Sequence, residues 1–150
     1  MRPYLASAAL LLALGGATLA AGDMMTQLKA KADAARGGER AKLCMEYARQ
    51  ELESANNLYN GGQLDEAKAE IEQVVAYARK GEDAATASGK QLKETEIKLR
   101  KLAERLHDIG NSLDFEDRGP VKQAIDQIQQ LRSDLLVKMW GPQAAPKGRS

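Results

Sequence analysis

The segment NNLYNGGQLDEAKAEIEQV, residues 56–74, places two adjacent glycines between two stretches with helical periodicity. After the glycines, apolar residues recur every three or four positions, at Leu64, Ala67, Ile71 and Val74. This spacing is typical of one face of an α-helix. Glycine readily adopts the left-handed conformation that ends a helix. The segment therefore predicts a tight turn between two antiparallel helices.

The rest of the chain shows the same helical periodicity, and no stretch alternates as a strand would. Five helices are predicted at roughly 23–36, 39–60, 63–80, 83–110 and 120–139. Glycines that follow a helical segment are expected to end it, and five stand in such places: Gly37, Gly61, Gly81, Gly110 and Gly141. The expected fold class is all-α, with about five helices forming antiparallel hairpins or a helical bundle.

The start of the fourth helix is open between two alternatives. Gly81 favours an early start, whereas Ser88-x-x-Gln91 is a capping-box pattern that favours a start near Ser88. Further along, a coiled-coil-like repeat predicts one apolar seam, formed by Leu92, Thr95, Leu99, Leu102, Leu106 and Ile109. The last helix begins near Pro120 and carries its apolar face on Val121, Ala124, Ile128, Leu131 and Leu135.

The N-terminal residues have the composition of a secretory signal. Arg2 precedes the apolar stretch YLASAALLLALGG, and small residues follow it up to Asp23. This order predicts export and cleavage between Ala20 and Ala21. The alternative is an uncleaved membrane anchor, but the apolar stretch from Tyr4 to Ala21 is at the short limit for a span and is weakened by Gly15-Gly16. The expected division is a signal peptide at 1–20, a helical domain at 21–140 and a disordered Pro/Gly-rich tail at 141–150. We expect a periplasmic or extracellular location and no stable membrane span after cleavage.

The charge balance argues against nucleic acid as a partner. The chain has 22 basic and 21 acidic residues. Cleavage at Ala20 would remove one basic residue, Arg2, and leave 21 of each. Binding driven by phosphate neutralisation needs a basic surplus or stripe, and the sequence has neither.

Cysteine and histidine each occur once, and this limits the chemistry. Cys44 cannot form an intramolecular disulfide, and its apolar helical neighbours favour burial over pairing with another molecule. His107 alone cannot form a histidine cluster for zinc. It is also the only histidine that could act as a catalytic base, and its local sequence RLHDIG has no catalytic signature. The remaining possibility for a cofactor is haem held between His107 and either Met24 or Met25. A core with few aromatic residues, and a further helix after His107, argue against it. We expect no enzyme activity, metal or cofactor.

The linker NSLDFEDRG, residues 111–119, is the most distinctive non-helical stretch. It is either a binding tip or a structural corner in which Phe115 folds under the hairpin and Asp117 or Arg118 ties the helix ends. The chain has only one phenylalanine, and a buried aromatic is valuable to a core, so we favour the corner. If the loop is a contact site, its residues are Phe115, Glu116, Asp117 and Arg118.

The segment around the double glycine resembles one unit of a tetratricopeptide protein. The resemblance rests on seven residues: Ala55, Leu58, Gly62, Leu64, Ala67, Ile71 and Val74. It implies that Ala55 and Ala67 face each other across a hairpin. The earlier half departs from the family, with Glu51 and Ser54 where an aromatic residue and leucine are usual. A tandem array would repeat after about 34 residues, but neither Gly62 nor Ala67 has a counterpart at that distance, so we expect no array.

A second resemblance covers residues 99–141 and concerns fold and location only. It rests on Arg100, Leu102, Leu106, the FEDR at 115–118, Arg132 and the DLL at 134–136. On these residues the segment resembles the closing hairpin of uncharacterised exported bacterial helical proteins. The family implies no activity. The sequence as a whole predicts an exported, non-enzymatic protein–protein interaction or scaffold module that binds a protein partner or itself. The alternative is a helical-bundle carrier of a small ligand or haem.

Overall fold

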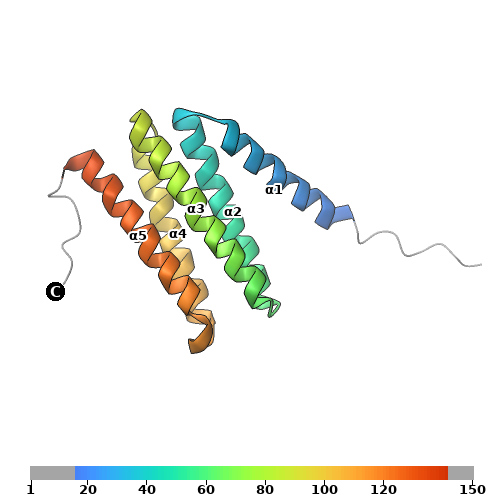
Figure 1. The fold of residues 1–150 in the computed structure, drawn as a ribbon. Coiled ribbons are helices and arrows are strands. Elements are labelled where there is room, and N and C mark those ends of the chain that lie inside the picture. The colour runs from blue at the N-terminus through green and yellow to red at the C-terminus, as the bar shows by residue number, and fades with distance from the viewer. Residues whose placement is uncertain (1–15, 142–150) are drawn as a thin grey trace, which may run out of the picture.

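The structure is a computed structural model that describes residues 16–141, and this part of the chain is helical apart from short connections (Figure 1). The elements are α1 (Gly16–Ala34), α2 (Gly37–Asn60), α3 (Leu64–Ser88), α4 (Leu92–Ser112), the 3-10 helix η1 (Phe115–Asp117) and α5 (Gly119–Trp140). The all-α fold with five α-helices is therefore confirmed. The helices pack in a bundle-like arrangement of hairpins, without a tandem repeat array.

Two antiparallel hairpins form the body of the molecule. Helices α2 and α3 make the first hairpin, and α4 and α5 make the second. The hairpins lie side by side in the same orientation, with α2 against α4 and α3 against α5 (Figure 1). Because the two hairpins have the same orientation, both hairpin turns lie at the same end of the molecule, which we call the turn end (Figure 1).

The turn at the double glycine shows how the chain reverses. The N–H of Gln63 donates to the carbonyl of Leu58 at 2.9 Å, and the N–H of Gly62 donates to the carbonyl of Tyr59 at 3.0 Å. These two bonds form a Schellman motif, which needs a left-handed residue next to the helix end. Gly62 supplies it with φ +75°, whereas Gly61 has φ −85°. The expected turn is present, and Gly62 takes the conformation expected of Gly61.

The expected helix end at Gly81 is wrong, because α3 continues through it to Ser88. Gly81 is buried, and a Cβ atom placed there would lie 3.0 Å from Sδ of Met45 and 3.3 Å from the carbonyl oxygen of Ala41. The glycine therefore allows α3 to approach α2 closely. Nearer the turn, Ala55 lies fourteen residues after Ala41 on α2, and Ala67 lies fourteen residues before Gly81 on α3. Both alanines are fully buried.

The break between α3 and α4 lies at residues 89–91, near the later of the two alternative starts. Gly89 ends α3 with φ +68°. The expected capping box is absent here, because the Ser88 hydroxyl donates to the carbonyl of Ala84 and accepts the N–H of Lys90. Gly110 also fails to end its helix, since α4 runs to Ser112. A Cβ atom at Gly110 would meet Val121 of α5 at 3.3 Å, so this glycine too serves helix packing.

The apolar faces of α4 and α5 form much of the core as predicted. Five of the six α4 seam positions are buried, and Leu92 is half-buried. All five predicted α5 positions are buried. Ion pairs then join neighbouring helices at the surface: Arg105 binds Glu53 at 2.9 Å, and Arg132 binds Glu96 at 2.6 Å. The first pair is half-exposed, and pairs of that kind add little stability, whereas Glu96 of the second pair is only 15% exposed.

Helix α1 packs on α2 and diverges from the other helices toward its N-terminus (Figure 1). Near its C-terminal end, Asp33 accepts a hydrogen bond from the Tyr77 hydroxyl at 2.9 Å and forms an ion pair with Lys80 at 3.2 Å. Burial raises the pKa of Asp33, but the bonds from Tyr77 and Lys80 outweigh that effect and lower it. The Tyr77 ring packs against Tyr47 of α2 at 4.4 Å between ring centres. A small polar cluster therefore ties α1 to the first hairpin.

Two of the predicted segments lie largely outside the described residues. Residues 1–15 of the expected signal peptide and residues 142–150 of the expected tail are not described. Helix α1 includes the position between Ala20 and Ala21, and nothing in the fold bears on cleavage there. Within residues 16–141, no helix is both long enough and apolar enough to cross a membrane.

Candidate functional site: an exposed aromatic tip and a cationic pocket

The loop between α4 and α5 exposes the only phenylalanine of the chain. Phe115 begins η1 at the turn end, and its side chain is 79% exposed. The expectation that Phe115 folds under the hairpin is therefore wrong. The Lys122 ammonium lies 5.9 Å from the centre of the ring.

The same loop is held in place by its own backbone and by Arg118. The Arg118 guanidinium donates to the carbonyl of Leu113 at 2.9 Å, and the Asp117 N–H donates to the carbonyl of Asp114 at 3.0 Å. Arg118 thus ties the helix ends, as the corner interpretation expects, while Phe115 projects, as the tip interpretation expects. The sequence offered these as alternatives, and the structure combines them.

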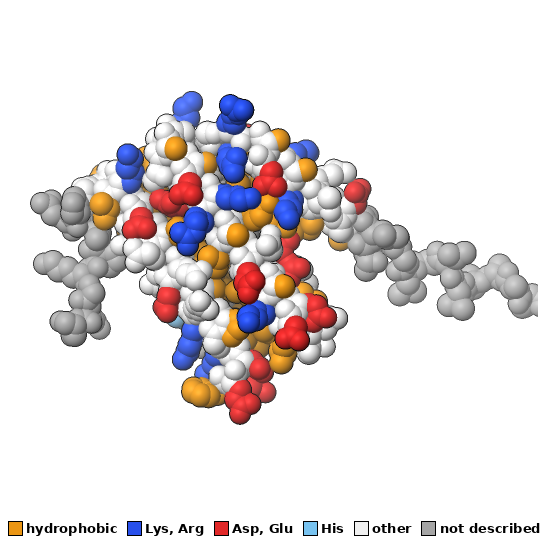
Figure 2. Space-filling model, viewed as in Figure 1, with side chains coloured by type: hydrophobic (Ala, Val, Ile, Leu, Met, Phe, Trp, Pro, Cys, Tyr) orange, Lys and Arg blue, Asp and Glu red, His pale blue; other side chains and the backbone are white. Residues whose placement is uncertain are grey.

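Acidic side chains surround Phe115 at the turn end. Asp114 and Glu116 are exposed, and Asp117 is half-buried. Burial raises the pKa of the Tyr59 hydroxyl at the end of α2, and the charge of Asp117 raises it further. The neighbouring turn adds a partly exposed Leu64, at 41%, together with Asp65 and Glu66. In the space-filling view the lower end of the molecule accordingly shows hydrophobic and acidic side chains (Figure 2).

The residues of the predicted tetratricopeptide-like hairpin divide between core and surface. Ala55, Ala67, Ile71 and Val74 are buried. Leu58 is half-buried and packs against the core from its edge. Gly62 and Leu64 are exposed in the turn and at the start of α3. The first four line the contact between α2 and α3, and the exposed pair belongs to the turn end.

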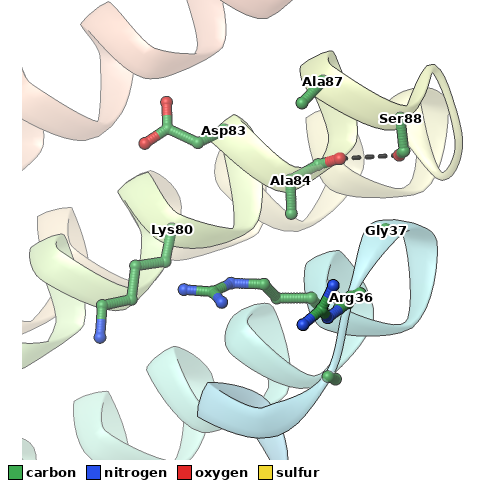
Figure 3. Close-up of a pocket in the computed structure, with 9 residues that line it drawn as sticks. Arg36, Gly37, Lys80, Asp83, Ala84, Ala87 and Ser88 are labelled. Atoms are coloured by element: carbon green, nitrogen blue, oxygen red, sulfur yellow. Dashed lines mark hydrogen bonds between the residues drawn. The ribbon is translucent and has the colours of Figure 1, made fainter.

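A cationic pocket lies at the opposite end of the molecule, where α1, α2 and α3 meet. Its volume is about 470 Å³. Arg36, Arg40 and Lys80 line it together with small residues of α3, including Ala84 and Ala87. Lys80 projects from α3 toward α2, whereas the Asp83 carboxylate projects from α3 away from α2 (Figure 3). The pocket therefore combines a positive rim with an apolar wall.

The sequence did not predict this pocket. Arg36 and Lys80 read as cations near helix C-termini, a common pattern that favours the helix dipole. They stand 44 positions apart, and only the fold of α1 and α3 onto α2 brings them together. A signal did exist in Gly81, because a buried glycine in a helix indicates a close approach by a neighbouring chain.

A second groove follows the contact between α2 and α4 and has a volume of about 210 Å³. Met45, Leu52 and Leu102 form its floor and are almost fully buried. Its rim carries four basic and two acidic side chains: Arg49, Lys98, Lys101, Arg105, Glu46 and Glu53. Two of the basic groups pair with the two acids. Because the floor residues are almost fully buried, this groove offers little apolar surface to a partner.

Cys44 is fully buried in the core, as predicted. Burial raises the pKa of its thiol, and the charges of Arg40 and Lys80 oppose that shift without cancelling it. Thiol reagents attack the thiolate, so a buried thiol with a raised pKa reacts slowly.

We therefore expect a thiol-reactive probe at pH 7.5 to label native Cys44 at least about tenfold more slowly than the protein in denaturant. The measurement is the labelling rate by mass spectrometry. The matched control is a Cys44→Ala, Ser88→Cys variant, whose half-buried thiol at the α3 end should label quickly without denaturant. Equal rates for the native and denatured wild-type chain would contradict the buried position.

The residues of the haem alternative do not come together. Met24 is 68% exposed on α1, whereas His107 lies exposed near the far end of α4, beside a small pocket formed with α5. Helix α1 packs on α2. The described part of the chain contains no group of three side chains placed to hold a metal ion.

Comparisons with known proteins do not extend these observations. No family model matches the chain, and neither a curated protein nor a solved structure shows significant similarity to it. The functional argument therefore depends on the surface of the molecule alone.

Proposed function

We propose that this chain is an exported, non-enzymatic helical protein that works as a protein–protein interaction module, with the loop at 113–118 as its contact surface. The observation that carries the proposal is the 79% exposure of Phe115. A large aromatic side chain left in water at a rigid position is typical of interaction sites, where aromatic residues contribute much of the binding energy.

The support for the loop consists of its fixed shape and its charge. Arg118 and the 3-10 helix hold the backbone, so little conformational freedom would be lost on binding. Asp114 and Glu116 flank the ring and would favour a cationic partner surface. The hairpin behind the loop holds the aromatic ring on a packed scaffold. We propose that residues 55–74 are one tetratricopeptide-like unit of this scaffold, and the buried Ala55 and Ala67 support that proposal.

Replacing Phe115 with alanine is expected to lower partner binding at least about tenfold, because aromatic anchors commonly contribute that much. Tagged wild-type and variant chains would be expressed in the native organism and purified with their partners, which quantitative mass spectrometry would then identify. The retained protein, once purified, would be titrated against each variant by calorimetry.

The matched control is Trp140→Ala. Trp140 is similarly large and 69% exposed, but it ends α5 at the opposite end of the molecule (Figure 1). The control should keep the wild-type partners and affinity. If Phe115→Ala retains the same partners at the same affinity, the loop is not the contact surface.

A further inference from the structure

The two ends of the molecule differ in charge and in shape. The turn end presents Phe115 as a projecting side chain among carboxylates, and the other end presents the cationic pocket of Arg36, Arg40 and Lys80. In the space-filling view, basic side chains line the upper edge and hydrophobic and acidic ones form the lower tip, although both charges occur in between (Figure 2). A projection at one end is thus matched by a pocket of opposite charge at the other.

We propose that Phe115 of one molecule docks into the cationic pocket of a second copy of this chain, so that the protein self-associates head to tail. This inference rests on the proposed function and names its partner. A phenylalanine ring fits an apolar wall such as that of Ala84 and Ala87, and cations beside the ring add a favourable cation–π contact. The carboxylates of Asp114 and Glu116 would then lie near Arg36.

The contact must form between molecules, because the two surfaces are far apart on one chain. Helix α2 alone has 24 residues and is therefore about 36 Å long. The pocket includes the start of α2, and the loop lies near the far end of the same hairpin.

Positive side chains at the pocket could pair with carboxylates of a second molecule. Arg36 forms no ion pair with any described residue, and Asp83 points away from Lys80 (Figure 3). Lys90 lies beside the start of α2, because a Cβ atom at Gly38 would meet its Cβ at 3.1 Å. Lys90 therefore adds a further positive charge at this end. The surface is therefore complementary to the acidic loop in charge.

A head-to-tail contact joins two different surfaces, and each new molecule leaves one of each free. Association should therefore continue beyond a dimer as concentration rises. The charged groups are exposed, so salt should weaken the contact.

Sedimentation velocity of the purified chain tests this. At low ionic strength the wild type should sediment faster as its concentration rises into the range of hundreds of micromolar, with several species present, and about 0.5 M salt should reverse the effect. Phe115→Ala and Arg36→Glu should each weaken association at least about tenfold. Arg36→Glu should not impair folding, because an acid at the start of α2 suits the helix dipole. Arg100→Glu, an exposed charge reversal on α4, should associate like the wild type.

Mixing the two impaired variants gives the decisive result. The Phe115→Ala chain keeps a working pocket, and the Arg36→Glu chain keeps a working loop. Together they should form a one-to-one dimer that cannot grow, whereas each alone stays monomeric. A wild type that remains monomeric at low salt, or a mixture that remains monomeric, overturns the inference. The proposed function is judged separately, because it fails only if Phe115→Ala keeps every partner of the wild type.

Discussion

Replacing Gly81 with leucine is expected to lower the free energy of unfolding by about 2 to 3 kcal/mol. A Cβ atom alone would lie 3.0 Å from Sδ of Met45 and 3.3 Å from the carbonyl oxygen of Ala41. The methionine can move, but the carbonyl belongs to the α2 backbone and can move only if the helices separate. The gain in helix propensity on replacing glycine, roughly 0.8 kcal/mol, opposes this loss without cancelling it.

Urea denaturation of the wild type and two comparison variants would measure the effect. Gly81→Ala should change the free energy of unfolding by less than about 1 kcal/mol, since the gain in helix propensity offsets the shift of Met45. Ala69→Leu, on the exposed face of the same helix, should stay within about 0.5 kcal/mol. If Gly81→Leu matches the wild type, α2 and α3 do not approach closely, and the packing of the first hairpin is different.

Replacing Glu82 with glutamine is expected to stabilise the protein at pH 8 by up to about 3 kcal/mol and to change little at pH 4. Glu82 is buried in α3. Burial raises the pKa of its carboxyl from 4.5 to about 7, and the charges of Asp83 and of Asp134 on α5 add to the shift, while Arg79 opposes it. Burying a carboxylate is costly unless it is paired.

The direction follows from proton binding. Between pH 4.5 and 7 the folded state holds a proton on Glu82 that the unfolded state has released. Stability therefore falls as the pH rises through this window and levels off above it. Lowered pKa values at Asp33, Glu46 and Glu53 make the free energy of unfolding rise with pH, which is the opposite effect. Only the difference between wild type and variant therefore isolates Glu82.

Thermal unfolding at pH 4, 6 and 8 would give that difference. Glu72→Gln, an exposed position on the same helix, should give a curve parallel to that of the wild type. A constant difference between Glu82→Gln and the wild type at all three pH values would mean that the folded and unfolded states bind the proton equally at this site.

The helical fold could be predicted because apolar periodicity acts through nearest neighbours on one helix. Thr95, Leu102 and Ile109 are buried where a seven-residue repeat places them. The break near Ser88 was harder. Gly81 and Gly89 have the same local preference, and only the approach of Met45 and Ala41 decides that the first continues a helix. That approach comes from another helix and leaves no local signal.

The candidate site was predictable in part. The sequence singled out residues 115–118, because an acidic loop with one aromatic residue stands out between two helices. It favoured an inward Phe115, and this was wrong, because the ring is 79% exposed. The space beneath a loop depends on how the two flanking helices pack, and the local sequence does not show that. The cationic pocket was not predicted for a similar reason, because Lys80 of α3 joins Arg36 and Arg40 at the start of α2 only in the folded chain.

The ordering of the helices also bears on how quickly the chain can fold. Each hairpin joins helices that follow one another in sequence, with a short connection at residues 61–63 and at 113–118. Contacts within a hairpin therefore span fewer residues than the contacts that pair α2 with α4 and α3 with α5, and proteins with more local contacts fold faster. Contacts between the hairpins, such as Glu53 with Arg105, span 52 residues. Folding should then consist chiefly of the docking of two partly formed hairpins. A substitution at Gly81, inside the first hairpin, should therefore change the folding rate more than a substitution at Arg105, which joins the two hairpins.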